Sequence, residues 1–129
     1  MKMPYISVWI HLNWSTKYRL PVFNTKTQIQ LCQHIRENAR LKGIYVDHIN
    51  IVDDHVHILV SLKADQSISR IVHLIKGESS NWINQQKLFE CKFKWQEEYY
   101  AVSVRKSELP KIRRYIRNQG KHHYRNGRD

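Results

Sequence analysis

Cysteine, glycine, proline and acidic residues are all scarce in this sequence. Its 129 residues include two cysteines, four glycines, three prolines and eleven Asp and Glu. Cys32 and Cys91 form neither a Cys-x-x-Cys spacing nor the set of several pairs that a disulfide-rich domain needs. We therefore expect two reduced thiols with no chemistry of their own.

Long hydrophobic runs are also missing. The apolar stretch at residues 6–14 is too short to span a bilayer, and Ser7, His11 and Asn13 interrupt it. We find no basic helix whose opposite face is rich in Trp, Phe and Leu, as an interfacial helix would be. The sequence predicts neither a signal peptide nor a transmembrane helix, no membrane partner, and a cytoplasmic protein.

Positive charge, in contrast, is abundant. Twenty-two Lys and Arg against eleven Asp and Glu leave a net charge of +11. Such an excess favours a polyanionic partner, because cations that neutralise phosphates release counterions and draw the partner in from solution. Nucleic acid is the first expectation. The chain is sized for a single domain over residues 1–129, and 41% hydrophobic residues are enough for one core.

The hydrophobic periodicity predicts an α+β fold. Alternation of two predicts strands over residues 5–14, 44–52, 55–62 and 99–105, whereas helical periodicity predicts helices over about 25–42 and 67–86. Gly43 ends the first helix, Ser67 caps the second, and Ser107 is expected to cap a third. The order β-α-β-β-α-β-α matches the ferredoxin-like (RRM-like) split βαβ unit, a four-stranded antiparallel sheet with two helices on one face. The third helix is then additional.

The strand over residues 55–62 carries two histidines one residue apart. His55 and His57 share one strand face, and the apolar residues Val56, Ile58, Val60 and Leu62 share the other. If the apolar face lies on the core, both imidazoles face the uncovered side of the sheet. Taken alone, a His-x-His pair is weak evidence for a site.

Two histidines do not complete a metal site, because even a sparse catalytic zinc site has three protein ligands. Gln119, in the third predicted helix, offers an amide oxygen. Two imidazoles with one such oxygen suit Mg²⁺ or Mn²⁺, and zinc, nickel and cobalt also accept these ligands. The sequence alone leaves the ion open.

Tyr115 lies four residues before Gln119, on the same face of that helix. Both residues belong to a stripe with Ile112 and Ile116 that is also typical of a packed amphipathic helix. A buried glutamine needs a polar partner, however, and a metal would supply one. The predicted DNA contacts are cationic: Lys17, Arg19, Lys76, Arg105, Arg114, Arg117 and Lys121.

These residues resemble the single-tyrosine HUH transposases of the insertion-sequence 200/605 type, in which HUH denotes His, a hydrophobic residue and His. The resemblance extends over nearly the whole chain. It includes His55-Val56-His57, the segment Tyr115-Ile116-Arg117-Asn118-Gln119 followed by His122-His123, and residues 11–23, 76–80 and 95–104. Several motifs in the right order are more specific than any one of them.

The resemblance implies cleavage and rejoining of single-stranded DNA that carries hairpins. It assigns Tyr115 as the nucleophile, which forms a covalent 5′-phosphotyrosine, and His55, His57 and Gln119 as the ligands of a divalent ion. It also implies a homodimer in which the tyrosine helix serves either its own histidines or those of the partner. No nucleotide cofactor is expected, since the covalent ester conserves the bond energy.

Three alternatives remain open from the sequence. One is a nucleic-acid-binding module without catalysis, built like an RNA-recognition platform, although the aromatic signature of that fold is missing. The others are a domesticated relative that processes repeated palindromes and a replication-initiator nickase. Both of these would share the tyrosine chemistry.

Overall fold

The computed structural model describes residues 4–120. Four strands, β1 (Val8–Ser15), β2 (Tyr45–Ile51), β3 (His55–Leu62) and β4 (Tyr100–Val104), alternate with three helices, α1 (Thr25–Leu41), α2 (Ile68–Gln85) and α3 (Leu109–Arg117). Two short 3₁₀ turns precede α1 and α3: η1 (Lys17–Arg19) and η2 (Lys106–Glu108). The predicted order of strands and helices is confirmed.

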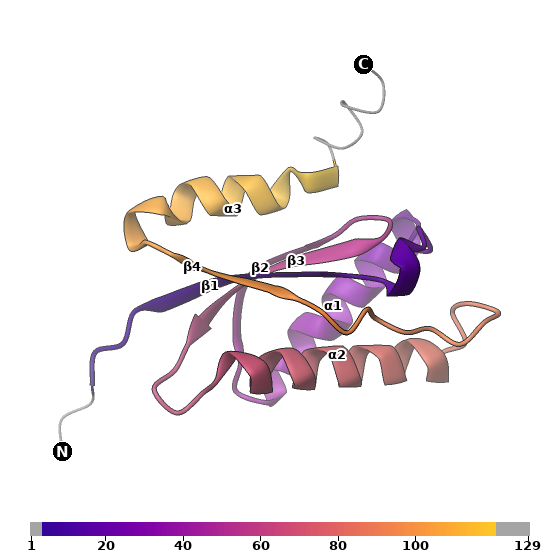
Figure 1. Ribbon diagram of the computed structural model, residues 1–129, viewed down its shortest axis with the longest axis horizontal. Coiled ribbons are helices and arrows are strands. Elements are labelled where there is room, and N and C mark those ends of the chain that lie inside the picture. Colours follow the sequence, from indigo (N-terminus) through magenta and orange to yellow (C-terminus); the bar gives the residue numbers. More distant parts are fainter. Residues whose placement is uncertain (1–3, 121–129) are drawn as a thin grey trace.

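The strands form one antiparallel sheet in the order β2-β3-β1-β4. Helices α1 and α2 cover one face of this sheet, and α3 lies across the other (Figure 1). The predicted ferredoxin-like arrangement, with an additional C-terminal helix, is therefore confirmed. Within residues 4–120, no helix is both long and apolar enough to cross a membrane.

Side-chain alternation along the central strands separates the two faces. On β3, Val56, Ile58 and Val60 are buried in the main core beneath α1 and α2. The intervening Leu59 points the other way and packs with Leu109 and Ile116 of α3 in a second, smaller cluster. The histidine face of the sheet is thus partly covered by α3, which brings that helix close to the site predicted there.

Local signals in the sequence fix the end of α1 and the start of α2. The Ser67 hydroxyl accepts a hydrogen bond from the Arg70 amide, as predicted for the cap of α2. Gly43 follows α1 with φ +72° and ends it in a Schellman motif, in which Gly43 and Ile44 donate back to the carbonyls of Arg40 and Ala39.

The predicted cap at Ser107 is wrong. Ser107 lies inside η2, and Glu108 precedes α3 without a side-chain cap. The 3₁₀ turn gives an amide at the start of α3 a backbone partner, since the Glu108 amide donates to the Arg105 carbonyl. Pro110 nevertheless occupies the first turn of α3, as predicted, where no amide is needed.

Candidate active site beneath the tyrosine helix

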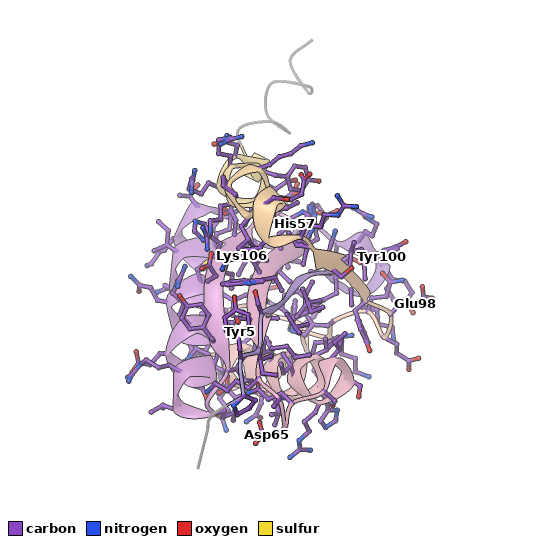
Figure 2. The ribbon with its side chains drawn as sticks, turned by 90° about the vertical axis from the view of Figure 1, so that its left-hand side faces the viewer. Tyr5, His57, Asp65, Glu98, Tyr100 and Lys106 are labelled. Carbon is purple, nitrogen blue, oxygen red and sulfur yellow. The ribbon has the colours of Figure 1, made fainter. Side chains whose placement is uncertain are left out.

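His55 and His57 lie side by side on the face of β3 that α3 covers. Their rings are nearly perpendicular, with centroids 4.8 Å apart, and both residues are buried, at 7% and 2% exposure. Alternation along the strand places them together, as the sequence predicts. Figure 2 shows His57 directly below α3.

His55 is oriented by the aspartate that precedes it. Asp54 Oδ1 lies 2.6 Å from His55 Nδ1, and Asp54 Oδ2 pairs with Arg19 Nε at 3.3 Å. Burial alone would raise the pKa of Asp54, but the hydrogen bond and charge of His55, together with Arg19, outweigh burial and lower it. The carboxylate engages Nδ1, which makes Nε2 the nitrogen of His55 that would coordinate a metal.

His57 contacts His11, much as His55 contacts Asp54, and the sequence patterns did not assign His11 to the site. His11 on β1 stacks on His57, with ring centroids 5.2 Å apart and His11 Nε2 3.0 Å from His57 Nδ1. Burial lowers the pKa of His11 below its ordinary 6.5, which favours the neutral imidazole. A neutral His11 ring can accept a hydrogen bond at Nε2 from His57 Nδ1. The alternation of β1 places His11 on its polar face together with Asn13, so the sequence did indicate which face His11 occupies.

Tyr115 approaches His57 and His11 from α3, which covers this face of the sheet. Its ring meets His57 edge-on at 5.7 Å between centroids and His11 at 5.9 Å. Tyr115 is 49% exposed, so the phenol is not simply part of the cluster that Leu109 and Ile116 form under α3. The structure therefore brings together the tyrosine and the histidine pair that the sequence placed 58 to 60 residues apart.

Gln119, in contrast to Tyr115, is buried at 6% exposure. Its amide nitrogen donates to the Tyr115 carbonyl at 3.1 Å, which leaves the amide oxygen as its ligand-type atom. In the part of the chain that the structure describes, no three His, Cys, Asp or Glu side chains are grouped to hold a metal. A metal site built on His55 and His57 would thus need a third ligand of another type, such as an amide oxygen.

A charged clamp fastens α3 to the edge of the sheet. Arg113 forms two hydrogen bonds to Asp47, Nε to Oδ2 at 2.9 Å and Nη2 to Oδ1 at 3.1 Å. Asp47 sits at a β-bulge in β2, where the pairing register shifts between Val46 and His48. A bulge turns a side chain out of the regular alternation, which explains how Asp47 meets α3.

Further contacts hold the last turn of α3. Asn50 of β2 donates its amide to the carbonyls of Ile116 and Arg117, at 2.8 and 3.3 Å. The ends of helices leave such carbonyls without helical partners, so Asn50 acts as a cap from outside the helix. Arg117 also contacts His48 Nε2 at 3.1 Å. Tyr115 is thereby held between the clamp and this cap.

The predicted DNA contacts have different surroundings. Lys17 and Arg19 are exposed on η1, and Arg105, Arg114 and Arg117 are exposed at and along α3. Lys76 on α2 instead donates its ammonium to the carbonyls of Gln96 and Glu97, so it braces the segment before β4. Lys121 and His122-His123 lie outside the described residues. None of these DNA contacts is tested by the structure.

A basic ferredoxin-like sheet that carries a histidine pair under a tyrosine helix defines a class of nucleic-acid enzyme, and comparisons with known proteins identify the family. The family model described as "Transposase IS200 like" matches residues 5–119. The chain therefore belongs to the IS200-like transposase family. Transposases of this family are DNA-cleaving enzymes.

Curated relatives agree with this assignment. The chain is 29% identical over 115 residues to the ISDra2 transposase TnpA of Deinococcus radiodurans, covering 84% of this chain and 81% of that protein. It is 27% identical over 115 residues to the transposase for insertion sequence element IS200 of Salmonella typhimurium, with 84% and 74% covered.

Solved structures share the fold. A candidate transposase from Deinococcus radiodurans superposes with a TM-score of 0.73 at 25% identity, covering 92% of this chain and 98% of that one. The REP-associated tyrosine transposase bound to a REP hairpin superposes with a TM-score of 0.70 at 16% identity, covering 95% and 73%. The second likeness shows the fold alone.

Proposed function

We propose that this transposase cleaves and rejoins single-stranded DNA by transesterification through Tyr115, at the ends of a mobile element marked by hairpins. The observation that carries the proposal is the approach of the Tyr115 ring to 5.7 Å from that of His57, across a sheet face that bears two buried histidines. A half-exposed phenol at a histidine pair is suited to attack a phosphodiester delivered from solvent.

In the proposed reaction, the Tyr115 phenol oxygen attacks the phosphorus of the scissile phosphodiester. The Tyr115 O–P bond forms and the P–O3′ bond breaks, which leaves a 5′-phosphotyrosine and a 3′-hydroxyl. The proton that the phenol loses is balanced by the one that the 3′ oxygen gains. Attack of a second 3′-hydroxyl on the phosphotyrosine reverses the exchange and joins the new strand, so no nucleotide cofactor is consumed.

His55, His57 and Gln119 would hold a divalent ion, Mg²⁺ or Mn²⁺. When bound, the ion would supply positive charge to the non-bridging oxygens of the phosphate. The protein's own contribution is positional. Asp54 and His11 fix the two imidazoles, while the Asp47–Arg113 clamp and Asn50 fix the helix that carries Tyr115.

The proposed partners follow from charge and family. The REP-associated transposase is bound to a DNA hairpin, and a similar single-stranded hairpin substrate suits the exposed arginines of α3 in this chain. We further propose a cytoplasmic homodimer. In the described chain, α3 packs on its own sheet, and a dimer in which α3 crosses to the partner's sheet would use the same clamp residues.

The proposal is tested by trapping the covalent intermediate. The protein is incubated with a labelled library of single-stranded hairpins and Mn²⁺ or Mg²⁺, then resolved on a denaturing gel. A covalent protein–DNA band is expected from the wild-type protein. Tyr115→Phe should lose the band, because the nucleophilic oxygen is gone, yet should still retain hairpins in a native gel.

Tyr45→Phe is the matched control. Tyr45 is 53% exposed on β2 and stands edge-on to Trp9, away from the histidines, so removal of its hydroxyl should leave the band unchanged. Retention of hairpins by the wild-type protein without any covalent band, across metals and hairpins, would refute the enzyme proposal and favour a binding module.

A further inference from the structure

A hollow of about 810 Å³ opens beside His55, at the end of the sheet where β1 leaves and β4 begins. One wall is the η1 turn and the other is the segment over residues 94–100. Figure 2 shows Tyr100 and Glu98 of that segment together at one edge of the molecule. The hollow is therefore adjacent to the histidine pair, yet none of the reaction steps described above uses it.

The two walls are joined by hydrogen bonds rather than by loose contact. The Lys17 amide donates to the Lys94 carbonyl, and the Gln96 amide donates to the Ser15 carbonyl, both at 3.0 Å. The Ser15 hydroxyl donates to Gln96 Oε1 at 2.6 Å. Trp95 anchors the second wall in the core, where its indole donates to Ser79. The hollow is thus formed before any ligand arrives.

Three tyrosines line this hollow with little burial. Tyr18 is 79%, Tyr100 71% and Tyr99 38% exposed, so their rings contribute little to the core. Tyr18 and Arg19 have φ values of 60° and 53°. Residues other than glycine rarely adopt this left-handed region, and such strain concentrates at functional sites. Tyr18 thus combines a strained backbone conformation with an exposed aromatic ring.

The charge of the lining indicates what the rings would contact. Lys17, Arg19 and Lys94 line the hollow together with Glu97 and Glu98, and Arg19 is already paired with Asp54. This near balance does not favour a phosphate backbone. Exposed phenol rings, with Asn13, Ser15 and Gln96 as hydrogen-bonding groups, are suited to unpaired bases instead.

We propose that this hollow binds unpaired bases of single-stranded DNA next to the phosphate that is cleaved, with Tyr18 and Tyr100 as stacking platforms. The proposal rests on the proposed function, because it takes the DNA strand across the histidines as given. It adds a base-reading subsite to a surface that otherwise attracts phosphates through the arginines of α3.

The test compares two labelled DNA ligands without divalent metal, so that no cleavage occurs: a blunt hairpin and the same hairpin with a randomised single-stranded flank. The wild-type protein should bind the flanked hairpin more tightly. Tyr18→Gly and Tyr100→Ala should each reduce this flank-dependent gain by about 5- to 150-fold per lost stack, and leave blunt-hairpin binding unchanged.

Tyr18→Gly separates binding from folding. Glycine adopts φ 60° without strain, so this variant should melt at the wild-type temperature or above while its flank binding falls. Tyr45→Ala, an exposed tyrosine outside the hollow, is the control and should keep the gain. Equal affinity of the wild-type protein for both ligands, or equal loss for both in the variants, overturns the subsite.

This outcome is independent of the covalent band. A wild-type band with no effect of Tyr18→Gly on flank binding refutes the subsite and leaves the transesterase standing. Loss of flank binding in the variants, from a wild-type protein that never forms the band, refutes the enzyme and its cleaved phosphate, and leaves only the binding of unpaired bases in the hollow supported.

Discussion

At the scale of single residues, Asp54 links the histidine pair to the η1 turn that lines the hollow. One carboxylate oxygen holds His55 Nδ1 at 2.6 Å and the other pairs with Arg19 of η1 at 3.3 Å. Outer carboxylates of this kind fix the orientation and basicity of a ligating imidazole. We predict that Asp54→Asn weakens Mn²⁺ binding by about 10- to 100-fold, the usual cost of losing such a partner, as measured by electron paramagnetic resonance of free Mn²⁺.

Asp53→Asn is the matched control for this measurement. The neighbouring Asp53 is exposed, and its backbone carbonyl accepts a hydrogen bond from the Phe23 amide. Asp53→Asn removes the same charge one residue away from Asp54, so the Mn²⁺ affinity of this variant should stay close to that of the wild-type protein. An equal loss in both variants would mean that general charge, and not the bond to His55, sets the affinity.

At the scale of elements, the clamp between α3 and β2 should make the stability of the folded protein fall at acidic pH. Burial tends to raise the pKa of Asp47, but Arg113 and His48 outweigh burial, so its pKa in the folded protein lies below the ordinary 3.8. A lowered pKa contributes stability that is fully present above the unfolded value and is lost as pH falls through the folded value. The affected window therefore lies below about pH 4.

Asp47→Asn should lower the free energy of unfolding at pH 7 by about 1 kcal/mol, a modest value because solvent reaches the guanidinium. The variant should also lose part of the acid dependence of stability, as measured by urea unfolding between pH 3 and 7. Asp65→Asn, an exposed aspartate in the loop before α2, should change neither quantity. Parallel pH profiles of wild type and Asp47→Asn would contradict the clamp.

Two glycines should respond in opposite directions to the same substitution. Gly43 holds φ +72° at the end of α1, so Gly43→Ala should destabilise the protein by about 1 kcal/mol through backbone strain. Gly77 lies in the middle of α2 with open space where a Cβ would stand, so Gly77→Ala should stabilise it by up to about 1 kcal/mol. Thermal unfolding of both variants checks the contrast. Two destabilising shifts would contradict the interpretation of Gly77, and two stabilising shifts would contradict that of Gly43.

Periodicity and local chemistry were enough to predict the elements, because strand alternation and helix stripes are local patterns. The pairing of Tyr115 with the histidines was instead implied by the family resemblance. The bulge that aims Asp47 at Arg113 was not predictable, since an extra residue in β2 matters only against the register of β3. Asn50 was missed for a similar reason. Its partners are carbonyls 66 and 67 residues away, and no sequence pattern marks a cap that comes from another element.

His11 is an intermediate case. Its position on the alternating face of β1 was visible in the sequence, but its stacking on His57 depends on β1 lying next to β3 in the sheet. The cap at Ser107 failed because residue type alone does not distinguish an α-helical start from a 3₁₀ turn. Sequence patterns therefore predicted which residues share a face, whereas contacts between elements required the fold.

At the scale of the whole molecule, the net charge of +11 should appear in the salt dependence of DNA binding. Each phosphate neutralised by a cation adds about 0.7 to 0.9 to the slope of log affinity against log salt. Arg105 and Arg114 are exposed at the face that carries Tyr115, whereas Lys26 is exposed on α1, on the opposite face of the sheet (Figure 1). The same charge should thus matter differently on the two faces.

We predict that Arg105→Ala and Arg114→Ala each reduce the slope by roughly 0.7 to 0.9 and weaken hairpin binding at low salt, as measured by fluorescence anisotropy from 50 to 300 mM NaCl. Lys26→Ala should leave the slope unchanged, because DNA held over the tyrosine helix does not reach α1. Equal slopes for all three variants would mean that hairpins bind through the diffuse field of the protein, and would place the DNA away from the face of α3.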